Sequence, residues 1–245
     1  MRSLRTNNFS RAIPRPFGAA NWVTLARALI AAALLAFVGS GSGFVTKWYD
    51  QSGQGNDIAQ ATASKQPKIV DSGTYLGAVE FDGVDDIAFY STPACNALTF
   101  CTRMQFRTAG TTTDQPIISS TANGSTGQLA YYFQRHDSNG NLDRFVFNGS
   151  SQYLVESSNI AFTENVELFA ISGTPQVLNV RYVDGSETSD GSGGSGSIAG
   201  GAFFASTASI GGSEAGSGWA PVSFKNFVIW AGDMRGSVAQ ITGLL

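Results

Sequence analysis

The chain has 245 residues, a formal net charge of −3 and a charged fraction of 13%, about half the ~25% of an average soluble protein. This length fits one large all-β domain, because sandwiches and barrels often run to about 200–250 residues as single units. Two cysteines and one histidine are too few for a disulfide framework or a zinc cluster. Cys95 and Cys101 flank the start of an expected strand, and we expect buried or half-buried thiols, with a bridge between them as the alternative.

The first 22 residues lack periodicity and are predicted to form an extended basic arm. Up to Tyr49 the chain carries six basic residues and no acidic one, whereas the remainder carries 9 basic and 18 acidic residues. A basic arm on an acidic body predicts docking onto an acidic protein neighbour. Nucleic acid is disfavoured, because the arginines lack interleaved aromatics and the acidic body repels phosphate. We assign partner anchoring to Arg2, Arg5, Arg11 and Arg15.

Residues 24–38 are predicted to form a helix. Thr24 is a candidate N-cap, the run Leu25–Val38 is apolar and rich in alanine, and Gly39 follows it, as expected at a helix end. A signal peptide or membrane anchor is the alternative. However, Arg27 interrupts the run, which is shorter than the ~20 residues of a membrane span. We therefore expect no membrane span and a helix whose apolar face packs on the sandwich.

The segment Trp48–Asp57 has the sequence Trp-Tyr-Asp-Gln-Ser-Gly-Gln-Gly-Asn-Asp. It predicts a tight polar turn after an aromatic-anchored strand. The Asp50 side chain is expected to accept backbone N–H bonds at the corner beside Gly53, with Asn56 in the same turn. These residue types explain a turn without any catalytic role.

A second turn is predicted at residues 82–86, where Asp82 caps the backbone and Gly83 supplies an unusual φ. Calcium prefers hard oxygen ligands, and Asp82, Asp85 and Asp86 offer three carboxylates. The spaced ligands and terminal glutamate of an EF-hand loop are missing. We therefore favour a structural turn, assign no metal site and leave calcium binding near this turn open.

From residue 44 onward, short apolar runs are broken by Gly, Asn, Asp and Ser, which is typical of an all-β sandwich. Apolar and polar residues alternate in 100–107 and 177–183, which indicates strands with one buried face. A flexible surface loop is expected within 184–201 and a short helix within 234–245. The predicted strands are Val45–Tyr49, Ala78–Phe81, Ile87–Phe89, Leu98–Arg107, Gln115–Ser119, Gln128–Gln134, Asp143–Asn148, Gln152–Glu156, Val166–Ser172, Gln176–Val183, Ala208–Ile210 and Ser223–Trp230.

An ordered set of motifs runs through the chain. It comprises Leu34–Gly39, Gly43–Thr46, Trp48–Asp57, Gln66-Pro67, Val79–Asp86, Tyr182–Gly185, Ser209–Gly212 and Phe224–Trp230. This set resembles laminin-G/concanavalin-A-like jelly-roll domains of the type found in phage and prophage structural proteins. The resemblance implies one antiparallel β-sandwich over residues 23–245. It also implies a hairpin at Asp184-Gly185 and a final strand that returns beside the first and seals the sandwich edge.

The turn that begins at Tyr49 is also similar to one in the arabinofuranosidase B family, a more distant resemblance. Glycoside hydrolysis generally needs two positioned carboxylates. The family's nucleophile motif, an Asn-Ala-Glu-Thr run beside paired cysteines, is absent, so no catalytic residue is assigned. Carboxylates that a hydrolase could use are nevertheless present at Glu80, Glu156, Glu164, Glu167 and Asp137.

Other chemistry-bearing residues are expected to be structural. His136 is placed in a solvated loop, because no Gly-x-Ser-x-Gly elbow accompanies it. No Walker loop or dinucleotide fingerprint is present, so no cofactor is expected. Aromatic residues that could stack on sugars are expected mostly in the core; they are Tyr131, Tyr132, Phe133 and Trp219.

The resemblance, the basic arm and the lack of a catalytic constellation together predict a non-enzymatic structural protein of a bacteriophage or related particle. It would be located in the virion as a capsid decoration, head-fibre or tail component. Its arm would dock onto other virion proteins, such as capsid, portal or tail proteins. The protein would be oligomeric in the particle, and its exposed loops would contact host surface glycans. Two alternatives share the fold, a glycosidase-like hydrolase and a free carbohydrate-binding module, because a fold does not fix a function.

Overall fold

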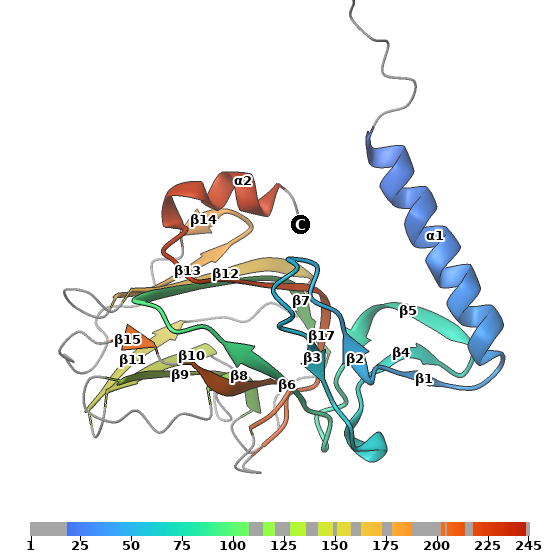
Figure 1. Cartoon of the computed structure of the whole chain (residues 1–245), viewed down its shortest axis with the longest axis horizontal. Helices are drawn as coiled ribbons and strands as arrows, with labels where there is room; N and C mark the ends of the chain where they lie inside the picture. Colours follow the sequence, from blue (N-terminus) through green and yellow to red (C-terminus); the bar gives the residue numbers. More distant parts are fainter. Residues whose placement is uncertain are drawn as a thin grey trace, which may run out of the picture.

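The structure, a computed structural model, describes residues 19–107, 115–120, 128–135, 142–148, 151–157, 163–172, 178–187, 202–203, 205–213 and 218–243. Two β-sheets stack face to face (Figure 1). Along both sheets the neighbouring strands are antiparallel. The predicted all-β antiparallel sandwich is therefore confirmed.

The first sheet contains, in spatial order, β1 (Gly43–Phe44), β4 (Lys68–Asp71), β5 (Thr74–Glu80), β17 (Val222–Trp230), β7 (Ala97–Phe106), β12 (Asn165–Ser172), β13 (Leu178–Val183) and β14 (Ser186–Glu187). The second contains β11 (Ser151–Ser157), β10 (Leu142–Asn148), β9 (Gln128–Arg135), β8 (Gln115–Ser120), β16 (Ser206–Ile210), β6 (Ala88–Thr92), β3 (Ile58–Ala59) and β2 (Lys47–Trp48). A short strand, β15 (Ala202–Phe203), pairs with β9 in parallel.

Each predicted strand has a counterpart in the structure, with ends that differ by a few residues. The strands that the sequence did not predict are short: β1, β3, β14 and β15 have two residues each, and β4 has four. A two-residue strand is too short for an alternating pattern to show. The predicted hairpin between β13 and β14 is present, and Asp184 (φ +48°) and Gly185 (φ +85°) both adopt the positive φ that such a turn needs.

The main core lies between the two sheets and is aromatic. Phe100 of the first sheet contacts Tyr131 and Phe133 of the second, with ring centroids 4.9 and 5.6 Å apart. Phe133 also stacks on Phe169 at 4.8 Å. All four rings are at most 2% exposed, and burial of such side chains contributes roughly 1.5–3 kcal/mol each. This packing fixes the sandwich that carries the loops.

A smaller cluster lies on the outer face of the first sheet. A 3₁₀ turn, η2 (Arg235–Ser237), leads into α2 (Val238–Thr242), which covers this face (Figure 1). Val238 and Ile241 of α2 pack with Leu168 and with the buried Cys101. The predicted terminal helix is therefore confirmed, and so are the two thiols, because Cys95 is half-buried and both are free. Burial raises the pKa of Cys101 to about 12.

The N-terminal helix differs from the prediction. α1 spans Ala19–Val38 and begins five residues before Thr24, which lies inside it and does not cap it. It projects away from the sandwich, with its C-terminal end beside β5 (Figure 1). Leu29, Ile30 and Phe37 are 62%, 63% and 90% exposed, so the expectation that its apolar face packs on the sandwich is wrong.

Within the part of the chain that is described, no helix is long and apolar enough to cross a membrane. Arm residues 1–18, with Arg2, Arg5, Arg11 and Arg15, lie outside the described residues. The arm's predicted last residues, 19–22, belong to α1.

The last long strand is also placed differently. β17 lies between β5 and β7 in the interior of the first sheet, and not beside the first strand at an edge. β17 pairs with β7 over most of its own length and with β5 only at Ser223 and Phe224. Pairing on both sides places β17 inside the sheet. The remainder of β17, from Asn226 to Trp230, pairs on one side only among the described strands.

Candidate functional site

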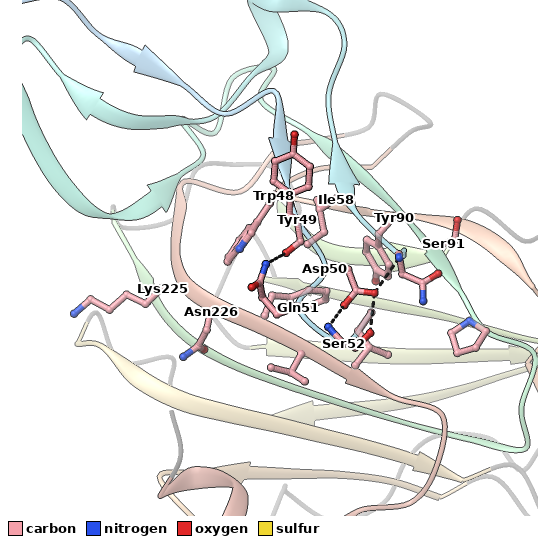
Figure 2. Close-up of a pocket in the computed structure, with 15 residues that line it drawn as sticks. Trp48, Tyr49, Asp50, Gln51, Ser52, Ile58, Tyr90, Ser91, Lys225 and Asn226 are labelled. Atoms are coloured by element: carbon pink, nitrogen blue, oxygen red, sulfur yellow. Dashed lines mark hydrogen bonds between the residues drawn. The ribbon is translucent and has the colours of Figure 1, made fainter. Parts of the chain in front are cut away.

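A pocket opens where β17 is no longer paired with β5. The segment Trp48–Asn56, which begins at the last residue of β2, lies against this part of β17, and β6 closes the third side (Figure 2). The pocket has a volume of about 340 Å³, near the lower end of the roughly 300–1,000 Å³ of small-molecule sites. It therefore joins segments that are far apart in the sequence.

Hydrogen bonds to two aspartates stabilise the loop that forms one wall of the pocket. Asp50 Oδ1 accepts the Ser52 N–H at 2.7 Å, while Oδ2 accepts the Ser52 hydroxyl at 2.8 Å and the Asn56 N–H at 3.0 Å. Asp57 accepts the Asp50 N–H at 2.9 Å and pairs with the Lys47 ammonium at 3.2 Å. The bonds from the Ser52 hydroxyl and N–H, with that from Asn56, lower the pKa of Asp50 to about 2. This wall therefore carries a negative charge at neutral pH.

The floor of the pocket is apolar. Ile58 of β3, Tyr90 of β6, and Phe227 and Ile229 of β17 line it. The Tyr90 ring lies 5.4 Å from that of Phe227, and its hydroxyl is hydrogen-bonded to Tyr131 at 3.0 Å. Burial raises the pKa of Tyr90. The floor is thus continuous with the main core, because Tyr90 belongs to that core and the other three side chains pack against it.

Two aromatic residues stand at the side of the pocket. Trp48 is half-buried and packs against the main core, whereas Tyr49 is 65% exposed. The Lys47 ammonium lies 5.4 Å from the centre of the Tyr49 ring, within the range of a cation–π contact. Trp and Tyr faces are suited to apolar faces of ligands because they combine area with few rotatable bonds.

Two amide side chains line the pocket with fixed orientations. Gln51 Nε2 donates to the Tyr49 carbonyl at 3.0 Å (Figure 2). Asn226 Oδ1 accepts the Arg103 N–H at 2.6 Å. The register of β17 on β7 shifts between Phe224 and Asn226, and such bulges change the direction of side chains.

The basic group at the rim is neutralised. Lys225 pairs with Glu164 at 2.5 Å, and Arg103 pairs with the same carboxylate at 3.3 Å. The bonds from Lys225 and Arg103 hold the pKa of Glu164 below its usual value. The carboxylate is therefore ionised at neutral pH and keeps the Lys225 charge balanced.

The second predicted turn lies elsewhere. Asp82 Oδ1 accepts the Val84 N–H at 2.8 Å, and Asp86 Oδ2 accepts the Asp82 N–H at 2.9 Å. Gly83 has φ +77° and packs against Pro221. The carboxylates of Asp82, Asp85 and Asp86 lie within 4.8 Å of one another. Their oxygens suit a hard cation, but Asp82 and Asp86 already serve the backbone of the turn, so the cluster carries no metal assignment.

The structure places the remaining sequence candidates as follows. Asp50 and Asn56 line the pocket, and Gly53 (φ +80°) lies in its loop. Tyr131 and Phe133 are buried in the core, and Trp219 is half-buried beside Gly212. The structure brings none of these three aromatics into the pocket lining. His136, Asp137 and the side chains of Tyr132 and Glu156 lie outside the described residues.

The three described carboxylates named for a hydrolase each pair with a base. Glu80 pairs with Arg107 at 2.9 Å, and the buried Glu167 pairs with Arg181 at 2.8 Å. Glu164 pairs with Lys225, as described above. None of the three lines the pocket, where Asp50 is the one carboxylate among the lining residues.

Sequence reasoning missed Trp48, Tyr49 and Gln51 as a binding surface, and also Lys225 and Asn226 opposite them. Trp48 and Tyr49 were assigned to a strand, and the polar pair Lys225-Asn226 interrupts an otherwise apolar run in β17. That interruption was the available signal, because a break in alternation often marks a bulge. Its position opposite Trp48 depends on the sheet order.

No protein-family model matches the chain, and no curated protein matches it in sequence. Solved structures do match, each at low identity. An arabinofuranosidase complexed with arabinofuranosyl-α-1,2-xylobiose has a TM-score of 0.57 at 14% identity, over 86% of this chain and 53% of that chain. The Trypanosoma rangeli sialidase in complex with sialic acid has a TM-score of 0.55 at 16% identity, over 82% and 31%.

Botulinum neurotoxin type C has a TM-score of 0.53 at 10% identity, over 86% of this chain and 52% of that chain. The present chain therefore spans about half the length, or less, of these three proteins. At such identities the likeness concerns the fold. The chain has the antiparallel jelly-roll β-sandwich that the resemblance implied.

Proposed function

We propose that this chain is a non-enzymatic carbohydrate-binding domain whose ligand site is the pocket between Trp48–Asn56 and β17. The observation that carries the proposal is the lining of that pocket. It combines exposed aromatic surface at Trp48 and Tyr49 with the amides of Gln51 and Asn226. Sugars present apolar C–H faces and hydroxyls that both donate and accept hydrogen bonds, so they match such a lining.

Named properties of the similar proteins support the proposal. The arabinofuranosidase is complexed with an arabinofuranosyl oligosaccharide and the sialidase with sialic acid. Cell entry of botulinum neurotoxin type C depends on interaction with two ganglioside molecules. Each involves a carbohydrate, although their shared fold alone does not determine a ligand.

The test is a glycan array followed by calorimetric titration of the strongest hit on the full chain. Tyr49→Ala is expected to weaken binding about tenfold, because it removes an aromatic face that contributes little to the core. Phe44→Ala is the matched control: Phe44 is 49% exposed and does not line the pocket, so binding should stay unchanged. Absence of any glycan binding, or equal loss in both variants, would overturn the proposal.

The hydrolase alternative is disfavoured by the state of Asp50. A glycosidase needs a second carboxyl group and a general acid with a raised pKa. Asp50 has its pKa lowered to about 2 and directs its oxygens to Ser52 and Asn56. We therefore expect no release from arabinofuranosyl substrates. Turnover that Asp50→Asn abolishes would favour the hydrolase.

The finer hypothesis concerns the setting of this domain, a structural component of a bacteriophage or related virion. The feature that favours it is α1, which projects from the sandwich (Figure 1). Its Leu29, Ile30 and Phe37 side chains are exposed. A projecting apolar helix after a basic arm suits attachment to other particle proteins. Deletion of residues 1–38 should abolish incorporation into particles and leave glycan binding intact. Unchanged incorporation would refute the attachment role.

A further inference from the structure

The charges around the pocket bear on the class of sugar that it takes. Lys225 is the one basic residue among the lining residues, and its ammonium is 2.5 Å from Glu164. Arg103 shares that carboxylate at 3.3 Å. A bound carboxylate would therefore compete with Glu164 for Lys225. Breaking an existing close pair offsets most of what a new pair would contribute.

The opposite wall adds a fixed negative charge. Asp50 lines the pocket, and its three hydrogen bonds from Ser52 and Asn56 hold it ionised. Its pKa of about 2 keeps that charge over the whole physiological range. An acidic sugar would place a like charge near this wall, and like charges at close range repel.

The two amides present opposite hydrogen-bonding groups, and backbone partners determine which. A backbone N–H can only donate, so the amide atom of Asn226 that faces the Arg103 N–H is Oδ1. Nδ2 of Asn226 is then the remaining donor. A carbonyl can only accept, so the Tyr49 carbonyl takes Gln51 Nε2 and leaves Oε1 as an acceptor. A hydroxyl can satisfy either group, whereas a carboxylate satisfies only the donor.

We infer that the pocket selects an uncharged sugar ring over its acidic counterpart, with one ring hydroxyl accepting from Asn226 Nδ2 and another donating to Gln51 Oε1. This inference rests on the proposed carbohydrate function and names its ligand class. It separates this chain from the similar sialidase, whose named ligand, sialic acid, is acidic. The selectivity arises from paired cations and a fixed anion, and needs no steric exclusion.

The experiment compares matched probes on the full chain by calorimetric titration: glucose with glucuronic acid, galactose with galacturonic acid, and lactose with sialyllactose. The neutral member of at least one pair should bind at least about tenfold more tightly than its acidic partner. The difference should shrink between about 50 mM and about 300 mM salt, because salt screens the repulsion. Equal or tighter binding of acidic partners, lost in Tyr49→Ala, would overturn the inference while the proposed function stands. Absence of binding by every probe would overturn both.

Three variants separate charge selection from a structural effect. Glu164→Gln leaves Lys225 without its carboxylate, and should raise affinity for acidic probes about threefold or more while neutral affinity stays within about twofold. Asn226→Asp keeps an oxygen for the Arg103 N–H but loses the donor, and should weaken neutral binding about tenfold. Asp71→Asn is the control, because Asp71 pairs with Lys68 outside the pocket lining. An equal gain of acidic affinity in Glu164→Gln and Asp71→Asn would contradict the inference.

Discussion

Two turns of this molecule are built on the same chemistry, but the pKa of an aspartate is lowered in one turn and raised in the other. In the Asp50 turn (residues 50–57) and the Asp82 turn (residues 82–86), an aspartate accepts backbone N–H groups and a glycine adopts a positive φ. The first turn lines the pocket. The second packs against Pro221 and closes on the buried Asp86.

The difference comes from burial. Hydrogen bonds, from the Ser52 hydroxyl above all, lower the pKa of Asp50 to about 2. Loss of solvent raises the pKa of Asp86 to about 6, despite its bond from the Asp82 N–H. Desolvation disfavours a charged carboxylate, whereas hydrogen bonds to it favour the charge. The same turn chemistry therefore gives a permanent anion at the surface and a titrating group inside.

The largest expected effect is on stability, and it distinguishes Gly83 of the Asp82 turn from Gly53 of the Asp50 turn. In Gly83→Ala the new Cβ would lie 2.8 Å from Pro221, at φ +77°. We expect the free energy of unfolding to fall by about 3 kcal/mol, the sum of left-handed strain and overpacking. The comparison is Gly53→Ala, where φ is +80° and nothing lies within 4 Å, so strain alone should cost about 1 kcal/mol. Urea unfolding midpoints measure both, and equal losses would refute the role of Pro221.

The next effect is the pH dependence of Asp86. Its folded pKa of about 6 lies above the usual value of 3.8 for an aspartate, so the native state holds the proton more tightly than the unfolded chain. The contribution of Asp86 to the free energy of unfolding is full below about pH 4 and is lost as pH rises through about 6. The free energy of unfolding therefore falls by roughly 2 kcal/mol over this range. Asp86→Asn should remove this fall, because an amide stays neutral and its oxygen still accepts the Asp82 N–H. Unfolding free energies in urea at about pH 4 and pH 7 test it; an unchanged fall in the variant would contradict the assignment.

The sequence predicted the sandwich better than the site, for a physical reason. Long strands such as β7 and β12 bury alternate side chains, and that alternation is visible residue by residue. The pocket instead depends on where β5 leaves β17, which is a property of sheet order. Trp48 and Asn226 are brought together by this order alone, and no local pattern encodes it.

The helix shows the converse limit. The apolar run ending at Val38 correctly predicted a helix, because composition determines local propensity. It did not predict the helix's surroundings, since a largely apolar surface does not specify which partner covers it. Phe37 is 90% exposed because the helix projects away from the sandwich, and only the arrangement of the elements in Figure 1 reveals that projection.

The smallest effect on stability concerns Asp50. Its folded pKa of about 2 lies below the usual value of 3.8 for an aspartate. Its contribution is therefore present above about pH 4 and is lost as pH falls toward about 2, the opposite direction to Asp86. Asp50→Asn should lower the melting temperature at neutral pH slightly and flatten its fall in acid, because an amide cannot accept all the bonds from Ser52 and Asn56. Thermal unfolding at about pH 7 and pH 3 measures this. The same variant removes the anion from the pocket wall, so it should narrow the gap between neutral and acidic sugars, whereas Asp86→Asn should leave that gap unchanged. A gap that responds to Asp86 and not to Asp50 would show that the repelling charge lies in the other turn.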